Sequence, residues 1–92
     1  MTEELDLLGL LIDKIEYQII TNKDNIKACK KDIKKLEKSK ADVIEAGIDD
    51  FIFDDNINRI MKVRENLVNR VEVLKKVKYR LVVSERMLKS VK

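Results

Sequence analysis

The side chains of this chain that could do chemistry are an acidic cluster near its middle, a single cysteine and a run of lysines. The acidic cluster, Asp49, Asp50, Asp54 and Asp55, offers the oxygen ligands that Ca²⁺ and Mg²⁺ prefer. An EF-hand loop, however, needs alternating acids, a glycine at its sixth position and a glutamate at its twelfth, and this cluster has none of these. We interpret it as helix capping and a solvated tip, and expect no metal and no other cofactor.

Catalytic side chains are scarce. Histidine, the commonest general base and metal ligand, is absent, so Cys29 has no partner for a Cys–His nucleophile. Gly9 and Gly47 are the only glycines, which excludes a glycine-rich phosphate loop. We therefore predict a protein that is not an enzyme and has no small-molecule substrate, with Cys29 as a small core residue.

Lysines are concentrated in one segment, which we call the basic band. A helical band of this kind can follow the phosphates of a nucleic acid, together with the basic residues between 59 and 80. It contains no aromatic side chain on which a base could stack, so we favour a solvated face and keep nucleic-acid binding as the alternative. The band consists of Lys23, Lys27, Lys30, Lys31, Lys34, Lys35 and Lys38.

The composition predicts one small helical domain that spans residues 1–92. Of the 92 residues, 40% are charged, 45% are hydrophobic, none is proline and 4% are aromatic, which is typical of long helices. One cysteine is typical of a reducing compartment, and residues 1–22 carry acids where a signal peptide carries positive charge. The apolar run Leu7–Ile12 is too short to cross a bilayer. We expect a cytoplasmic protein without a membrane partner.

Two stretches show the alternating three- and four-residue apolar spacing of a coiled coil. The first is apolar at ten of twelve positions: Leu5, Leu8, Ile12, Ile15, Ile19, Asn22, Ile26, Cys29, Ile33, Leu36, Lys40 and Val43. The second is apolar at nine of twelve: Phe53, Asn56, Ile60, Val63, Leu67, Arg70, Leu74, Val77, Leu81, Ser84, Leu88 and Val91. We predict an all-α fold, a long antiparallel two-helix hairpin that is coiled-coil-like.

A turn separates the two stretches. Gly47 can end a helix in the left-handed conformation, Ile48 can make the accompanying apolar contact, and Asp49 or Asp50 can cap the next helix. We expect helices over about 3–46 and 50–92 with a turn at 47–49, which places residue i opposite residue 96−i. A register shifted by one heptad, with i opposite 103−i, also aligns the seams, but it leaves Phe53 in a loop.

Charge is segregated along the chain. Residues 1–22 have a net charge of −4, residues 23–40 of +5, residues 41–55 of −6 and residues 56–92 of +8. In an antiparallel hairpin the acidic residues 1–22 lie beside the basic residues 74–92, which favours this chain direction.

More hydrophobic residues are present than one seam between two helices can cover. Because a contiguous apolar strip on a small protein marks an association surface, we predict that hairpins dimerise into a four-helix bundle or dock onto a helical partner. The alternative is a third helix, made by a break near residues 22–23 or 66–69. The predicted partner interface is Leu7, Leu11, Ile57, Met61, Val68, Val71 and Val82, with Phe51 and Ile52 at the tip.

Two resemblances to known families concern parts of this pattern. The amphipathic segment 5–20 looks like the first helix of all-helical chorismate mutases, but Gly9 stands where that family needs an active-site arginine, so the activity is not carried over. The length and central turn resemble the small hairpin proteins of the WXG type, which accompany specialised secretion. Their Trp-x-Gly turn is absent, and Tyr79 is not followed by an acid four residues on, so this resemblance concerns architecture only.

The pattern as a whole predicts a module that works by protein–protein contact, such as an adaptor, an assembly factor or an inhibitor. Small size and Lys-, Ile- and Asn-rich usage lead us to expect a phage or mobile-element origin. Nucleic-acid binding through residues 23–40 and 59–80 is the first alternative. A role as the hairpin partner of a secreted effector is the second.

Overall fold

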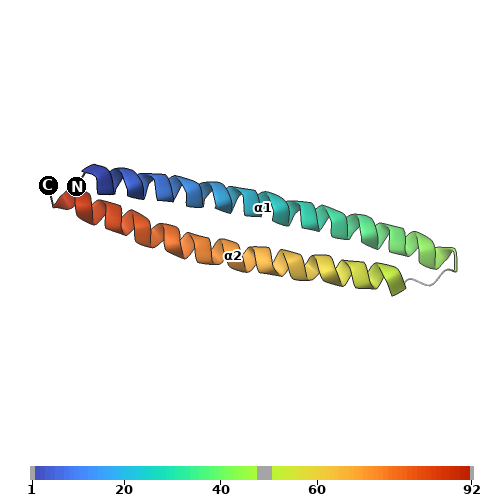
Figure 1. Cartoon of the computed structure of the whole chain (residues 1–92). Coiled ribbons are helices and arrows are strands. Elements are labelled where there is room, and N and C mark those ends of the chain that lie inside the picture. Colours follow the sequence, from blue (N-terminus) through green and yellow to red (C-terminus); the bar gives the residue numbers. More distant parts are fainter. Residues whose placement is uncertain (1, 48–50, 92) are drawn as a thin grey trace.

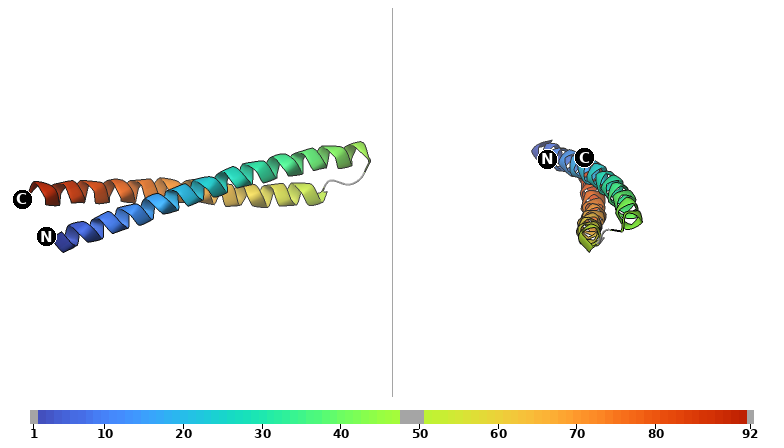
Figure 2. Two further views of the ribbon diagram at one scale, coloured as in Figure 1. Left: turned by 90° about the horizontal axis from the view of Figure 1, so that it is seen from above. Right: turned by 90° about the vertical axis from the view of Figure 1, so that its right-hand side faces the viewer.

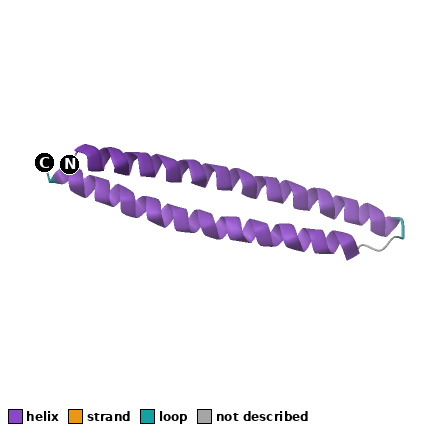
Figure 3. Cartoon of the chain, in the orientation of Figure 1, coloured by secondary structure: helices purple, strands orange, loops and turns teal. Residues whose placement is uncertain are grey.

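The structure is a computed structural model that describes residues 2–47 and 51–91, with side chains for residues 3–47 and 52–91. It contains two long helices, α1 (Thr2–Glu45) and α2 (Phe51–Ser90), which run antiparallel side by side (Figure 1). The described residues include no strand (Figure 3). The predicted all-α hairpin is confirmed, and both helices are unbroken, so the alternative with a third helix is wrong.

The turn begins where the sequence predicts it. Gly47 has a φ of 78°, the left-handed conformation that glycine adopts without steric cost. The N–H of Ala46 donates to the carbonyl of Asp42 at 3.1 Å, and the N–H of Gly47 donates to that of Ile44 at 3.0 Å. These bonds use carbonyls that the end of α1 would otherwise leave unsatisfied. The predicted roles of residues 48–50 lie outside the described residues.

The hairpin is a rod with extents of 72 × 14 × 14 Å. Seen from above, α1 crosses over α2 at a shallow angle, as expected for helices that wind around each other (Figure 2). The first turn of α1 and the last turn of α2 lie at one end of the rod, which we call the open end (Figure 1). Neither helix contains, in its described part, a stretch apolar and long enough to cross a membrane.

Two ion pairs between the helices identify the register. Lys78 Nζ lies 2.6 Å from Glu16 Oε1, and Lys40 Nζ lies 2.5 Å from Asp54 Oδ1. In the register that places residue i opposite residue 96−i, Glu16 lies opposite residue 80 and Lys40 lies opposite residue 56. Each ion-pair partner is therefore two residues away from the position directly opposite. In the register shifted by a heptad, Glu16 would instead lie opposite residue 87. The tight-turn register is therefore the one that the hairpin adopts.

The predicted seam of α1 is confirmed at every position. All twelve residues from Leu5 to Val43 are buried or half-buried, and Ile19 and Ile33 are the most buried of them. Asn22 is a buried polar residue of this seam, with 9% of its surface exposed, and Cys29 is half-buried.

The predicted seam of α2 is wrong at every second position. Phe53 and the ladder that continues through Leu88 face α1 as predicted, but residues 56, 63, 70, 77, 84 and 91 are exposed. Their places are taken by the residues one position further along the chain, Ile57, Arg64, Val71, Lys78 and Glu85.

The physical reason is that α2 has apolar residues on both flanks of its leucine ladder. The flank that faces α1 brings in Ile57 and Val71, together with long side chains whose methylene groups cover the seam while their charged ends reach water. Lys78 does this and reaches Glu16. The other flank would have brought in Asn56, Arg70 and Ser84.

The core of the hairpin is thin. Among the described residues, four hydrophobic side chains are buried (Ile19, Ile33, Ile57 and Val71) and none is fully buried. The rod exposes 7349 Å², whereas a globular monomer of 10.8 kDa exposes about 5500 Å². A large apolar area therefore stays in contact with water.

Candidate interaction surface

The surface beside the seam divides into two long faces, one on each side. On one side a hollow between the helices is lined by Lys23, Lys75, Tyr79 and Val82, above the seam residues Ile19 and Lys78. On the other side a hollow is lined by Tyr17, Gln18, Thr21 and Arg70, above Asn22 and Leu74. Residues seven apart lie on the same side of a helix in a packed pair. The residues that line the two hollows therefore show which side of the seam each heptad position faces, and an exposed residue beside the seam is assigned to the face on its side.

The two faces differ in charge, and we name them for this difference. Among the positions whose side chains the structure describes, 14 of 23 are charged on the side of Lys23 and Lys75, which we call the charged face. On the side of Gln18 and Arg70, which we call the neutral face, eight of 25 are charged. The large exposed apolar side chains of the neutral face are Leu7, Leu11, Ile52, Val63, Val73, Val77, Met87 and Val91. All but Ile52 and Val63 lie in the half of the rod toward the open end.

The predicted partner interface is divided by the structure. Leu7 and Leu11 are exposed on the neutral face. Met61 and Val68 are exposed on the charged face, where Val82 is half-buried. Near the turn Ile52 is 68% exposed, and the side chain of Phe51 lies outside the described residues.

The prediction that Ile57 and Val71 stay available to a partner is wrong. They are only 8% and 5% exposed because they form part of the seam with α1. Val63 and Val77 were predicted to lie in the seam, but both are exposed, because Ile57 and Val71 occupy the seam instead.

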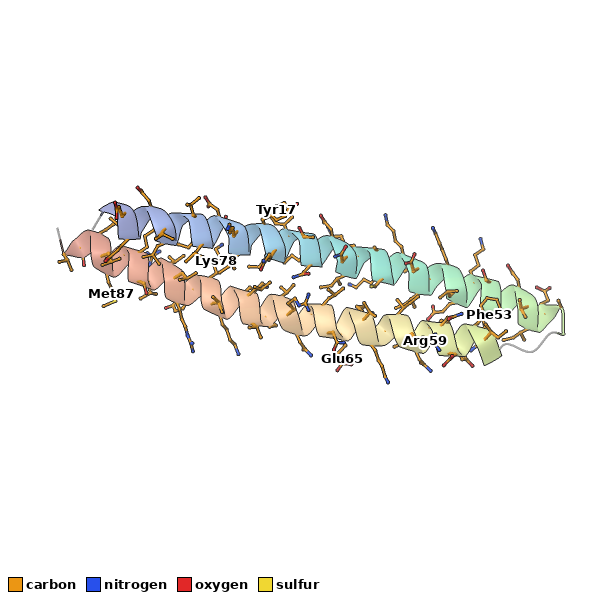
Figure 4. All side chains as sticks on the ribbon, in the orientation of Figure 1. Tyr17, Phe53, Arg59, Glu65, Lys78 and Met87 are labelled. Carbon is orange, nitrogen blue, oxygen red and sulfur yellow. The ribbon has the colours of Figure 1, made fainter. Side chains whose placement is uncertain are left out.

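Sequence reasoning also missed Val73 on the neutral face. It lies one turn before Val77, and the same four-residue spacing separates Met87 from Val91. This four-residue spacing of apolar side chains could have indicated the neutral face from the sequence. It identifies an exposed face, however, only once the residues of the seam are known. Met87 points away from α1, whereas Lys78 lies between the helices (Figure 4).

The basic band is exposed along its whole length. None of its seven lysines forms an ion pair within the part of the chain that the structure describes. The cations that do form ion pairs there include Lys40, Arg59 and Lys78. The band thus concentrates positive charge on α1, although Asp24, Asp32 and Glu37 lie among its lysines.

Residues for a metal centre are not assembled in the described ranges, where no three His, Cys, Asp or Glu side chains gather. Asp49 and Asp50, half of the acidic cluster, lie outside those ranges. The geometry thus offers two candidate surfaces, the neutral face and the basic band. In comparisons with known proteins, no family model, no curated protein and no solved structure matches this chain.

Proposed function

We propose that this chain is a non-enzymatic protein–protein interaction module, an adaptor, assembly factor or inhibitor, whose hairpins associate as a homodimer into a four-helix bundle. The observation that supports this most strongly is the row of exposed apolar side chains on the neutral face, on a rod whose own core is thin. The proposal includes a cytoplasmic setting, which a single cysteine favours.

The number of apolar side chains in this row determines how tightly two hairpins are expected to associate. Fully burying a Val, Leu or Met side chain contributes about 1.5–3 kcal/mol, so a half-exposed one contributes about 1 kcal/mol. Six such residues near the open end of each copy contribute about 12 kcal/mol to a dimer, and association costs about 4–15 kcal/mol in lost motional freedom. The balance is at most about 8 kcal/mol in favour of association, so we expect a concentration-dependent dimer with a dissociation constant of about 1 μM or weaker.

Sedimentation equilibrium tests the proposal across this range. The wild type should shift from one chain mass to two as concentration rises. Val77→Lys on the neutral face should weaken the dimer at least about tenfold, because it places a charge in the contact. Val68→Lys is the matched control on the charged face, since Val77 and Val68 are 38% and 41% exposed.

Two results would count against the proposal, and one control is needed. A mass of one chain at every concentration contradicts the homodimer. Equal effects of V77K and V68K contradict the neutral face as the contact. Circular dichroism at 222 nm must show unchanged helix content for both variants, because otherwise a weaker dimer would reflect unfolding.

A second candidate function is binding to a nucleic-acid backbone. The lysines of the basic band favour it, because they form no ion pair with the side chains that the structure describes. With no aromatic residue in the band, binding would be independent of base sequence and would weaken steeply with salt. Replacing Lys27, Lys30 and Lys34 by glutamine should weaken binding to a DNA duplex and reduce the salt slope, as measured by fluorescence anisotropy at low and high salt. The control K14Q/R86Q/K89Q removes the same charge near the open end. A wild type that binds neither DNA nor RNA at low salt refutes this candidate.

A further inference from the structure

We propose that two hairpins pack antiparallel through the open-end half of the neutral face, about a two-fold axis that crosses the rod at the level of Val82. The copies then overlap over roughly half of their length, and their turn ends extend in opposite directions. This inference names the partner surface and direction of the homodimer and therefore rests on the function proposed above.

The first support is the order of residue types along the neutral face of α2. Around the level of residue 82, the exposed residues on this face pair by equal separation: Arg80 with Ser84, Val77 with Met87, and Val73 with Val91. A two-fold axis there places each residue beside its pair on the partner helix, as an isologous contact requires. The spacing is a property of any heptad pattern, but the match of apolar with apolar and polar with polar is a property of this sequence.

The neutral face of α1 fits the same axis. Its exposed residues pair around the level of residues 12–13, Leu11 with Lys14 and Leu7 with Gln18. In the register of this hairpin residue 82 lies opposite residue 14, which is about 1.5 residues, or about 2 Å, from the centre of the α1 pairs, so one axis can serve both helices. Each leucine thus meets the carbon stem of a longer polar side chain, which can cover it while its end stays in water.

Charge selects the antiparallel direction. In a parallel packing, the two turn segments 41–55, each with a net charge of −6, would lie side by side, and so would the two basic bands. The staggered antiparallel packing keeps the turn segments at opposite ends and leaves most of each basic band outside the overlap. Like charges that are brought together in a contact oppose association. The overlap does place the open-end segments of equal charge beside each other, but the neutral face carries only three charged side chains there, Glu4, Lys14 and Arg80. Separation of the turn segments and of the basic bands therefore favours the antiparallel arrangement.

The area of the overlap is that of a weak contact. About 20 residues of each helix take part, because an axis at residue 82 places residue 73 beside residue 91, and this is about 30 Å of rod at about 1.5 Å per residue. With a width of roughly 15–20 Å, each copy buries about 450–600 Å², or about 900–1200 Å² in total. This range ends at the lower limit of stable specific protein interfaces, in keeping with a dimer that dissociates on dilution.

Electron paramagnetic resonance distances between spin labels test the arrangement. The full chain with Cys29→Ala receives one labelled cysteine at Ser84, on the neutral face near the axis, at Arg86, on the charged face at the same level, or at Asp42, near the turn. Labels at Ser84 should lie within about 25 Å of each other. The two α2 helices pack about 10 Å apart, and the two Ser84 Cα atoms are offset by about 6 Å along the length of the rod. Labels at Arg86 should be at least about 15 Å further apart, because helices of about 10 Å diameter separate them.

The Asp42 labels report direction independently of the contact itself. Each lies about 29 residues from the axis, so their expected separation is about 90 Å in the antiparallel dimer. A short distance at Asp42 would mean parallel packing, and a distance at Arg86 shorter than at Ser84 would mean the wrong face. Either result overturns this inference while the homodimer stands. Sedimentation of the unlabelled chain as a monomer at every concentration overturns the homodimer and this inference together.

Discussion

Val71 and Val68 lie three residues apart on α2, and comparing their alanine variants tests the seam on which the account of the hairpin depends. Val71 is 5% exposed, and Val68 is 41% exposed on the charged face. Val71→Ala removes two buried carbon groups at about 0.8 kcal/mol each, and the better helix propensity of alanine returns about 0.5 kcal/mol. We expect V71A to lower the free energy of unfolding by about 1–1.5 kcal/mol. For V68A the two effects nearly cancel, so the change should stay within about 0.5 kcal/mol.

Thermal and urea unfolding, followed by circular dichroism at 222 nm, measures both variants. V71A should lower Tm by about 5–10 °C, as expected for a domain of this size, and V68A by far less. Neither residue lies on the neutral face, so at equal protein concentration association affects both variants alike. A V68A variant as destabilised as V71A would refute the assigned seam of α2. A neutral V71A with a destabilised Val77→Ala would restore the seam that the sequence alone indicated.

Three further predictions concern single residues. Gly9→Ala should raise the free energy of unfolding by about 0.5–1 kcal/mol, because Gly9 lies within α1 and has space for a Cβ. Gly47→Ala should lower the free energy of unfolding by about 1 kcal/mol, because Gly47 has a positive φ. Urea unfolding measures both variants, and changes of the same sign would contradict this prediction. Asn22→Ile should raise Tm because it removes a buried polar group from the seam, and a lower Tm would mean that the amide of Asn22 has hydrogen-bond partners that the seam needs. Breaking the partly exposed Lys40–Asp54 pair with Asp54→Asn should cost less than about 1 kcal/mol in low salt and nearly nothing in 1 M salt, and a larger effect that persists in salt would contradict this estimate.

The sequence was sufficient to predict α1 because its apolar residues follow one unambiguous stripe. Ten of twelve seam positions are apolar, and the neighbouring positions on either flank are mostly polar in the middle of the helix. The turn was equally clear, because Gly47 is the only glycine between two such stripes and no proline competes with it.

The seam of α2 could not be predicted because the leucine ladder has valines or isoleucines on both flanks. Local spacing favours neither Ile57 and Val71 nor Val63 and Val77, and only the fit against α1 decides between them. Arg64 and Lys78 are half-buried in this seam although they are charged, because their long stems can cover the seam while their charged ends reach water.

The neutral face could not be predicted for the same reason. It consists of the residues that remain exposed once the seam is known. Because the wrong flank of α2 was assigned to the seam, the predicted interface included the buried Val71 and left out the exposed Val77. Leu7 and Leu11 are exposed, as the correctly predicted seam of α1 requires.

Small-angle X-ray scattering over a concentration series tests most directly whether the hairpin acts by associating with a second copy. The forward scattering gives the mass in solution, and the account predicts a rise from the 10.8 kDa of one chain to twice that mass. The longest dimension should rise beyond the 72 Å of one rod, because the two copies overlap only in part. A mass of one chain at the highest concentration would contradict the account.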